Sequence, residues 1–373
     1  MREVLIIAGE ASGDLHGAGV AERLRALRPE VPLVGMGGDR MAAAGVQLFE
    51  RAEGVVGFVE VLKHLPSHLR LLRQVKARLR SGRVGLIILI DYPGFNLRVA
   101  RAAHDAGVPV LYYITPQVWA WKPGRLTMMA DVITKAAVIL PFEERLLREA
   151  GIDATFVGHP LLDRAQSLPD QTEARRRLGL PLDREVLALF PGSRAQEIER
   201  HVHGFELVAR ELQRRRPGLE VVVSVAPTIQ LDASHLPYPM VRAQSFDVLR
   251  AADVALCKSG TTTLEAAVAG CPCAVVYKTS RITYEIARRL VSIPHIGLLN
   301  VVAGREVAPE FVQEAFTTQA VADALAPLFG AESPARARMQ QGMDEVRRLL
   351  GSPGAAVRVA EMASAMMPRE RAS

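Results

Sequence analysis

Two stretches in the second half of the chain place glycine, hydroxyl and arginine side chains directly after an apolar segment. Residues 186–190 run into Pro-Gly-Ser-Arg at residues 191–194, and residues 254–257 run into the hydroxyl-rich residues 259–263. Glycine lets a backbone approach a ligand closely, and Ser193 can cap the helix predicted to follow it. The N–H groups at the start of a helix bind anions. Two such sites in one half of a chain predict a ligand that carries a nucleotide diphosphate.

Carboxylates follow two apolar segments of the first half. Glu10, Ser12 and Asp14 lie in a polar loop after the first segment, and Asp91 directly follows residues 86–90. Polar residues at the ends of buried strands are typical of active sites, and a partly buried Asp91 would have the raised pKa of a general base. In the alternative interpretation, Ser12 or Asp14 caps the next helix and Asp91 is a turn or cap residue. The sequence leaves open which carboxylate is the base.

Aromatic rings are concentrated in residues 112–121, which contain both tryptophans, Trp119 and Trp121. Amphipathic rings suit the face of a sugar or the rim of an acyl groove. Packing in the core is the alternative, and the sequence does not decide between the two.

A basic amphipathic helix is predicted at residues 62–80, since no acidic residue occurs between Glu60 and Asp91. Such a helix is a candidate for contact with an anionic membrane. The alternative is an ordinary helix whose apolar stripe packs on a sheet. That stripe contains Leu62, Leu65, Leu69, Leu72, Val75 and Leu79.

Short apolar segments alternate with helical patterns along the whole chain. This alternation predicts an α/β protein with parallel sheets, organised as two Rossmann-like domains facing across a cleft. We expect an N-terminal domain at residues 1–165, a nucleotide-binding domain at residues 166–345 and a helical tail at residues 346–373. The expected strands are residues 4–8, 33–35, 86–90, 110–114, 137–140 and 155–157 in the first half, and 186–190, 221–225, 254–257 and 274–277 in the second. The expected helices are residues 17–27, 62–80, 98–106, 141–149, 198–215 and 263–269.

The composition limits the classes of function. With 373 residues, 49% of them hydrophobic, and a net charge of +6, the chain is an ordered globular protein that suits an acidic ligand or an anionic surface. No nucleic-acid-binding signature is present, so no nucleic-acid partner is expected. The cysteines suit a reducing compartment, and no segment is apolar enough for a signal peptide or a membrane span, which predicts a cytoplasmic protein. Neither the His201 and His203 pair nor Cys271 and Cys273 has further ligands nearby, so no metal and no cofactor is expected.

The motifs GEASGDLHG, IDYPGFN, TPQVWAW, VGHP, LFPGSRAQEI, SGTTTLEA and LLNVVAGRE occur in this order. From Val4 to about Phe329, the chain thereby resembles the lipid-A-disaccharide synthase family. The resemblance implies the GT-B glycosyltransferase fold and an inverting transfer. UDP-2,3-diacylglucosamine and 2,3-diacylglucosamine 1-phosphate (lipid X) would give the β-1,6-linked lipid A disaccharide 1-phosphate and UDP.

The resemblance also implies roles for individual residues. Asp91 would be the base, with Glu10 nearby, and Arg194 would stabilise the leaving diphosphate. The implied nucleotide contacts are Gly192, Ser193, Arg194, Glu197, Ser259, Gly260, Thr261, Thr262, Glu265, Asn300 and Glu310. The implied acceptor contacts are Ser12, Asp14, Asn96, Gln117 and Trp119, with Glu10 on the same side.

The family works at the cytoplasmic face of the inner membrane, which agrees with a membrane contact by Leu62, Leu65, Leu69 and Leu72. It also implies a possible homodimer with exchanged C-terminal segments. The competing interpretations are another GT-B enzyme that uses a UDP-amino sugar, a UDP-sugar 2-epimerase, and a non-catalytic lipid- or nucleotide-binding protein. An epimerase would need no acyl-chain surface, so the basic helix weighs against it.

Overall fold

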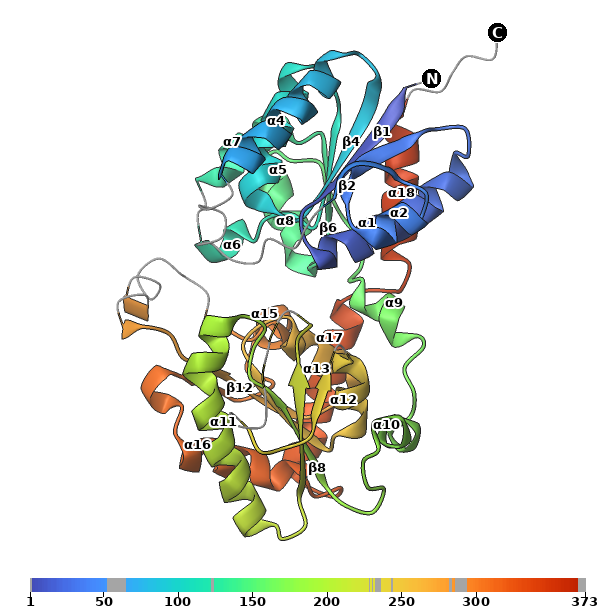
Figure 1. Ribbon diagram of the computed structural model, residues 1–373. Helices are drawn as coiled ribbons and strands as arrows, with labels where there is room; N and C mark the ends of the chain where they lie inside the picture. The colour runs from blue at the N-terminus through green and yellow to red at the C-terminus, as the bar shows by residue number, and fades with distance from the viewer. Residues whose placement is uncertain are drawn as a thin grey trace. The chain divides into compact units, whose positions relative to one another are not determined.

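A computed structural model describes residues 2–51, 65–121, 124–227, 229, 231, 236–242, 244–281, 284–285 and 294–367. The chain forms two compact units, shown in Figure 1. The first unit contains residues 1–163 and 351–373, and the second contains residues 164–350. Within the described residues, no helix is both long and apolar enough to cross a membrane.

The first unit is built on a parallel sheet of seven strands in the order β3-β2-β1-β4-β5-β6-β7. The central strand β4 and its neighbour β1 are buried along their whole length, as apolar strands covered on both faces should be. The strands are β1 (Glu3–Ala8), β2 (Leu33–Gly37), β3 (Gln47–Arg51), β4 (Val84–Ile90), β5 (Val110–Tyr113), β6 (Lys135–Val138) and β7 (Ala154–Phe156).

Helices cover both faces of this sheet (Figure 1). The buried apolar side chains form two clusters, which are the cores of this unit. One core contains side chains of α4, α5, α7 and α8, and the other contains side chains of α1, α2 and α18. The C-terminal helix α18 packs along α1, although the two are far apart in sequence. The helices are α1 (Ala11–Leu27), α2 (Asp39–Ala43), α4 (Leu65–Arg80), α5 (Pro93–Asp105), α6 (Val118–Trp121), α7 (Arg125–Val132), α8 (Pro141–Glu149), α9 (Leu161–Ala165) and α18 (Ala355–Met366).

The second unit contains a parallel sheet of six strands in the order β10-β9-β8-β11-β12-β13. Figure 1 shows α11 and α16 on one face and α12, α13 and α17 on the other. The strands are β8 (Val186–Phe190), β9 (Glu220–Val225), β10 (Met240–Arg242), β11 (Val254–Lys258), β12 (Cys273–Tyr277) and β13 (Glu310–Val312). The helices are α10 (Gln171–Leu178), α11 (Ala195–Arg215), α12 (Ser245–Ala251), α13 (Thr262–Ala269), α15 (Leu298–Ala303), α16 (Thr318–Leu325) and α17 (Pro334–Leu349), with 3₁₀ turns at Gln313–Ala315 and Ala326–Leu328.

The prediction of an α/β chain with two parallel sheets is confirmed, and each predicted strand and helix overlaps one in the structure. Three predicted helix starts were too late. α1 begins at Ala11 rather than at residue 17, α5 at Pro93 rather than at 98, and α11 at Ala195 rather than at 198. The first turns of these helices contain small or polar residues, with a glycine in α1 and α5, so they lack the apolar periodicity by which a helix is recognised. The short strands β3, β10 and β13 were missed for a similar reason, since none of their residues is buried.

The apolar stripe of α4 packs largely on the sheet. Val75 and Leu79 are fully buried, and Leu72 is half-buried against the same core. For Leu72, Val75 and Leu79, the structure therefore supports the alternative interpretation, an ordinary helix packed on a sheet. Leu69 is exposed, at 41% of its surface, while Leu62 and the side chain of Leu65 lie outside the described residues.

Candidate active site

Strand register brings two acidic chain segments to the same edge of the first sheet. β1 and β4 are hydrogen-bonded neighbours in which Ala8 pairs with Ile90, so Glu10 and Asp91 leave the sheet beside each other. Glu10 is exposed, whereas Asp91 is mostly buried. Burial, together with the negative charge of Glu10, raises the pKa of Asp91 to about 6. Such a carboxyl group is ionised at neutral pH and is still a better proton acceptor than an ordinary aspartate.

The other predicted acceptor residues of α1 differ in their surroundings. Ser12 is exposed in the first turn of the helix. Asp14 is buried, and its carboxylate accepts hydrogen bonds from the backbone N–H groups of Gly38 (2.6 Å), Arg40 (3.1 Å) and Met41 (3.1 Å). Neither side chain caps α1, so the interpretation of Ser12 or Asp14 as its cap is wrong. Asp14 instead satisfies backbone N–H groups at the start of α2. Its contact with an acceptor stays a prediction.

Asn96 is fully buried at the start of α5. Its amide nitrogen donates to the backbone carbonyls of Ile90 (3.2 Å) and Asp91 (2.8 Å). The side chain therefore supports the turn that carries Asp91, and direct contact with an acceptor is untested.

Gln117 is exposed after β5, and Trp119 is half-buried in α6. The indole Nε1–H of Trp119 donates to Oε1 of Glu143 at 3.0 Å, and its ring meets Phe142 edge to face. The side chain of Trp121 is not described. Glu143 is almost fully buried, and burial raises its pKa to about 7. Sequence reasoning missed Glu143, because a glutamate in the first turn of a helix is ordinary.

In the second unit, the turn after β8 is held by the first turn of α11. Gly192 has a φ of +137°, and a Cβ atom there would lie 2.8 Å from Cβ of Glu197, so the position requires glycine. The predicted cap by Ser193 is wrong, since the N-cap residue of α11 is Arg194. Instead, the backbone N–H of Ser193 donates to Oε2 of Glu197 at 3.0 Å. The side chain of Arg194 is 67% exposed, with its guanidinium 3.7 Å from Glu197.

Lys258, which sequence reasoning also missed, lies at the end of β11. β11 is the neighbour of β8, and Cys257 pairs with Phe190, so Lys258 and the Gly192 turn leave the sheet side by side. The ammonium of Lys258 lies 2.7 Å from Oε1 of Glu197. Although burial raises the pKa of Glu197, the pairing with Lys258 holds it below its usual range. Lys258 and Arg194 thus place two cations beside the turn.

The second predicted anion site begins α13. The Ser259 hydroxyl donates to the carbonyl of Ile296 at 2.7 Å, and Gly260 has a φ of +159°. Thr261 is exposed and Thr262 half-exposed at the helix start. Because β8 and β11 are neighbours, this helix start and the Gly192 turn lie at the same edge of the sheet. Two anion-binding backbone segments there are suited to a diphosphate.

The remaining predicted nucleotide contacts are engaged within the protein. Glu265 is buried, and Arg164 approaches its Oε1 at 3.3 Å. Glu310 accepts hydrogen bonds from the N–H groups of Ile296 (2.9 Å) and Gly297 (2.8 Å) and from the Asn300 amide (2.8 Å). Asn300 also donates to the carbonyl of Ala308 and accepts from the N–H groups of Val307 and Ala308. These side chains hold the loops at the strand ends, and their contact with a nucleotide stays a prediction.

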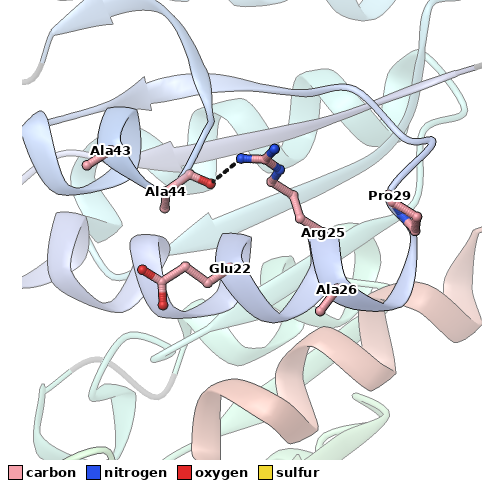
Figure 2. A pocket seen from close by; sticks show the side chains of 6 residues that line it. All are labelled: Glu22, Arg25, Ala26, Pro29, Ala43 and Ala44. Carbon is pink, nitrogen blue, oxygen red and sulfur yellow. Dashed lines mark hydrogen bonds between the residues drawn. The ribbon is translucent and has the colours of Figure 1, made fainter.

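Figure 2 shows a surface pocket of the first unit that is separate from these residues. It lies between the end of α1 and α2, where the Arg25 guanidinium donates to the carbonyl of Ala44 at 3.2 Å. Because α1 starts at the carboxyl edge of the sheet, its end lies at the opposite edge, away from Asp91. The lining residues are Glu22, Arg25, Ala26, Pro29, Ala43 and Ala44. Within the ranges that the structure describes, no group of three His, Cys, Asp or Glu side chains could hold a metal ion.

Solved structures with this arrangement include both transferases and epimerases. The chain is similar to the calicheamicin glycosyltransferase, with a TM-score of 0.61 and 15% identity, covering 98% of each chain. It is also similar to a putative UDP-N-acetylglucosamine 2-epimerase from Listeria monocytogenes, with a TM-score of 0.64 and 12% identity, covering 97% of this chain and 96% of that one. At such identities the likeness shows the fold alone. The chain has two Rossmann-like units with polar residues at the ends of their strands, so its fold is of the GT-B class.

Sequence relatives narrow this class to one family. A family model described as Lipid-A-disaccharide synthetase matches residues 4–363. The chain is 41% identical to the lipid-A-disaccharide synthase of Syntrophus aciditrophicus, covering 98% of each chain. It is 40% identical to that of Myxococcus xanthus, covering 99% of this chain and 98% of the relative. The chain therefore belongs to the lipid-A-disaccharide synthase family, and its role is glycosyl transfer in lipid A disaccharide synthesis.

Proposed function

We propose that this chain joins UDP-2,3-diacylglucosamine to lipid X by an inverting transfer. In this reaction Asp91 removes the proton of the acceptor 6-hydroxyl while that oxygen attacks C1 of the donor from the face opposite UDP. The new bond has the β-1,6 linkage, and UDP leaves. The observation that carries the proposal is the mostly buried carboxyl group of Asp91 at the end of β4, with its pKa of about 6.

The transition state develops positive charge at C1 and negative charge on the departing diphosphate. Base catalysis by a positioned carboxylate contributes about 10²–10⁴-fold in rate. The diphosphate would be stabilised by the N–H groups that begin α11 and α13, together with Arg194 and Lys258. These groups supply positive charge without a metal ion, so we expect transfer to continue in EDTA.

The acyl chains of both substrates require the enzyme to work at a lipid surface. Arg70, Arg73 and Arg80 are exposed on α4, and Leu69 is exposed between them and the start of the helix. Exposed cations beside an apolar side chain support peripheral association with anionic lipids, here the cytoplasmic face of the inner membrane. A homodimer with exchanged C-terminal segments stays a prediction.

The test is the Asp91→Asn variant, with Asp105→Asn as a matched control at the exposed end of α5. We expect the first variant to lose about 10²–10⁴-fold in turnover while its affinity for UDP is unchanged, and the control to retain turnover. Near-normal turnover of Asp91→Asn would show that another group, such as Glu10, is the base.

A further inference from the structure

The turn after β4 holds two successive residues in the left-handed region. Asp91 has a φ of +47° and Tyr92 a φ of +49°. Residues with a Cβ atom adopt this conformation rarely, at a cost on the order of 1–3 kcal/mol each where it is strained. The surrounding structure must therefore hold the turn in place.

Both backbone polar groups of Asp91 are fixed by neighbouring elements. Its N–H donates to the carbonyl of Tyr113 on β5 at 3.0 Å. Its carbonyl oxygen accepts two hydrogen bonds from side chains, one from the Tyr112 hydroxyl and one from the Asn96 amide, each at 2.8 Å. Both donor side chains are fully buried. We call these two side chains, Tyr112 and Asn96, the carbonyl clamp.

The carbonyl clamp is retained at a cost in stability. The Oδ1 atom of Asn96 is buried and has no hydrogen-bond partner in the part of the chain that the structure describes. The amide cannot be reversed to relieve this, because its oxygen would then face the carbonyls of Ile90 and Asp91. Leaving a buried acceptor unsatisfied costs about 1–3 kcal/mol. Conformational strain and unsatisfied groups that persist together are typical of functional sites.

We propose that Tyr112 and Asn96 act as positioning residues that hold the Asp91 turn so that its carboxylate faces the acceptor hydroxyl. This inference rests on the proposed function, in which Asp91 is the base. A base displaced by about 1 Å can lose 10²-fold in rate, so even a small relaxation of the turn should be measurable. Tyr112 reaches the turn from β5, and Asn96 reaches it from α5, so the clamp joins two elements at one backbone atom.

The pKa of Asp91 depends on the charged and titratable groups around the turn, so the pH dependence of activity reports on the turn separately from stability. The negative charge of Glu10, which precedes α1, helps to raise the pKa of Asp91, and the positive charge of Arg125 on α7 opposes the rise in the pKa of Tyr112. His68 on α4 is hydrogen-bonded to the Tyr92 hydroxyl. Burial raises the pKa of Tyr112 well above its usual range, so its hydroxyl stays a neutral donor. If the clamp is lost, the Asp91 carboxyl group becomes better hydrated, and its pKa falls toward the ordinary 3.8.

The experiment compares Tyr112→Phe with Tyr238→Phe, a matched control in the second unit whose hydroxyl donates to Gln213 at 3.4 Å. We expect Tyr112→Phe to lower kcat by about 10- to 100-fold without a change in KM, and to move the acid limb of kcat/KM to lower pH. The control should change neither quantity. Asn96→Ala should reproduce both effects, and it replaces Tyr112→Phe if that variant does not fold.

Asp91→Asn is measured in parallel to separate the two claims. If Asp91→Asn is inactive but the clamp variant keeps the kcat and the pH profile of the wild type, the carbonyl clamp has no positioning role. If Asp91→Asn remains active, the base assignment fails, and the inference about the clamp fails with it.

Discussion

Replacing Lys258 by methionine should have two effects that can be measured separately. It should destabilise the second unit, and it should weaken the binding of UDP. In the structure, the Lys258 ammonium lies 2.7 Å from Glu197, and the side chains of the pair are 14% and 13% exposed. Breaking a fully buried ion pair costs about 3–5 kcal/mol, whereas breaking an exposed pair costs about 0–1 kcal/mol. For this partly buried pair we expect the free energy of unfolding to fall by about 2 kcal/mol.

The loss of UDP affinity has a different origin. A hydrogen bond to a charged group contributes about 1.5–3 kcal/mol, so Lys258→Met should weaken UDP binding by roughly 10- to 100-fold. Isothermal titration calorimetry with UDP measures the affinity, and thermal unfolding measures the stability. The double variant Lys258→Met/Glu197→Gln removes the unpaired carboxylate, so it should recover most of the stability but none of the affinity.

Two results would refute this reasoning. Wild-type affinity for UDP in Lys258→Met would show that the ammonium does not contact the diphosphate. Recovery of affinity in the double variant would show that Lys258 matters only because it neutralises Glu197.

Three further predictions concern other parts of the site. Glu143 should titrate with a pKa of about 7, so tryptophan fluorescence should change around that pH through Trp119, and Glu143→Gln should abolish the change. Burial raises this pKa above the ordinary 4.5, so the contribution of Glu143 to the free energy of unfolding is present below about pH 4.5 and is lost as the pH rises through about 7. Chemical denaturation at a series of pH values measures this loss. Gly192→Ala should weaken UDP binding measured by calorimetry, because a Cβ atom at a φ of +137° would displace Glu197. Asn300→Ala should lower the melting temperature, since two backbone N–H groups lose their acceptor at about 1–3 kcal/mol each.

The strands that position the site could be predicted from the sequence because they are buried on both faces. β4 is apolar from end to end, and a polar residue directly after such a strand must lie at its carboxyl edge. This reasoning located Asp91 and the Gly192 turn. It could not predict the left-handed conformation of Asp91, since that depends on bonds from Tyr112 and Asn96.

The residues that were missed acquire their roles only through partners distant in sequence. Lys258 meets a glutamate 61 residues earlier, and Glu143 meets an indole 24 residues earlier. Each looks unremarkable in its own segment, one as the last residue of a strand and the other in the first turn of a helix. Asp14 shows the same limit, because its place in a polar loop did not reveal that its carboxylate binds backbone N–H groups at the start of α2.

The central claim is tested most directly by a transfer assay with the purified full chain. The mixture contains UDP-2,3-diacylglucosamine, radiolabelled lipid X and EDTA, and a parallel mixture contains UDP-N-acetylglucosamine without an acceptor. We predict a labelled tetraacyl disaccharide 1-phosphate and stoichiometric UDP in the first mixture, and no epimer in the second. The absence of a disaccharide although UDP binds, or epimerisation without an acceptor, would contradict the account.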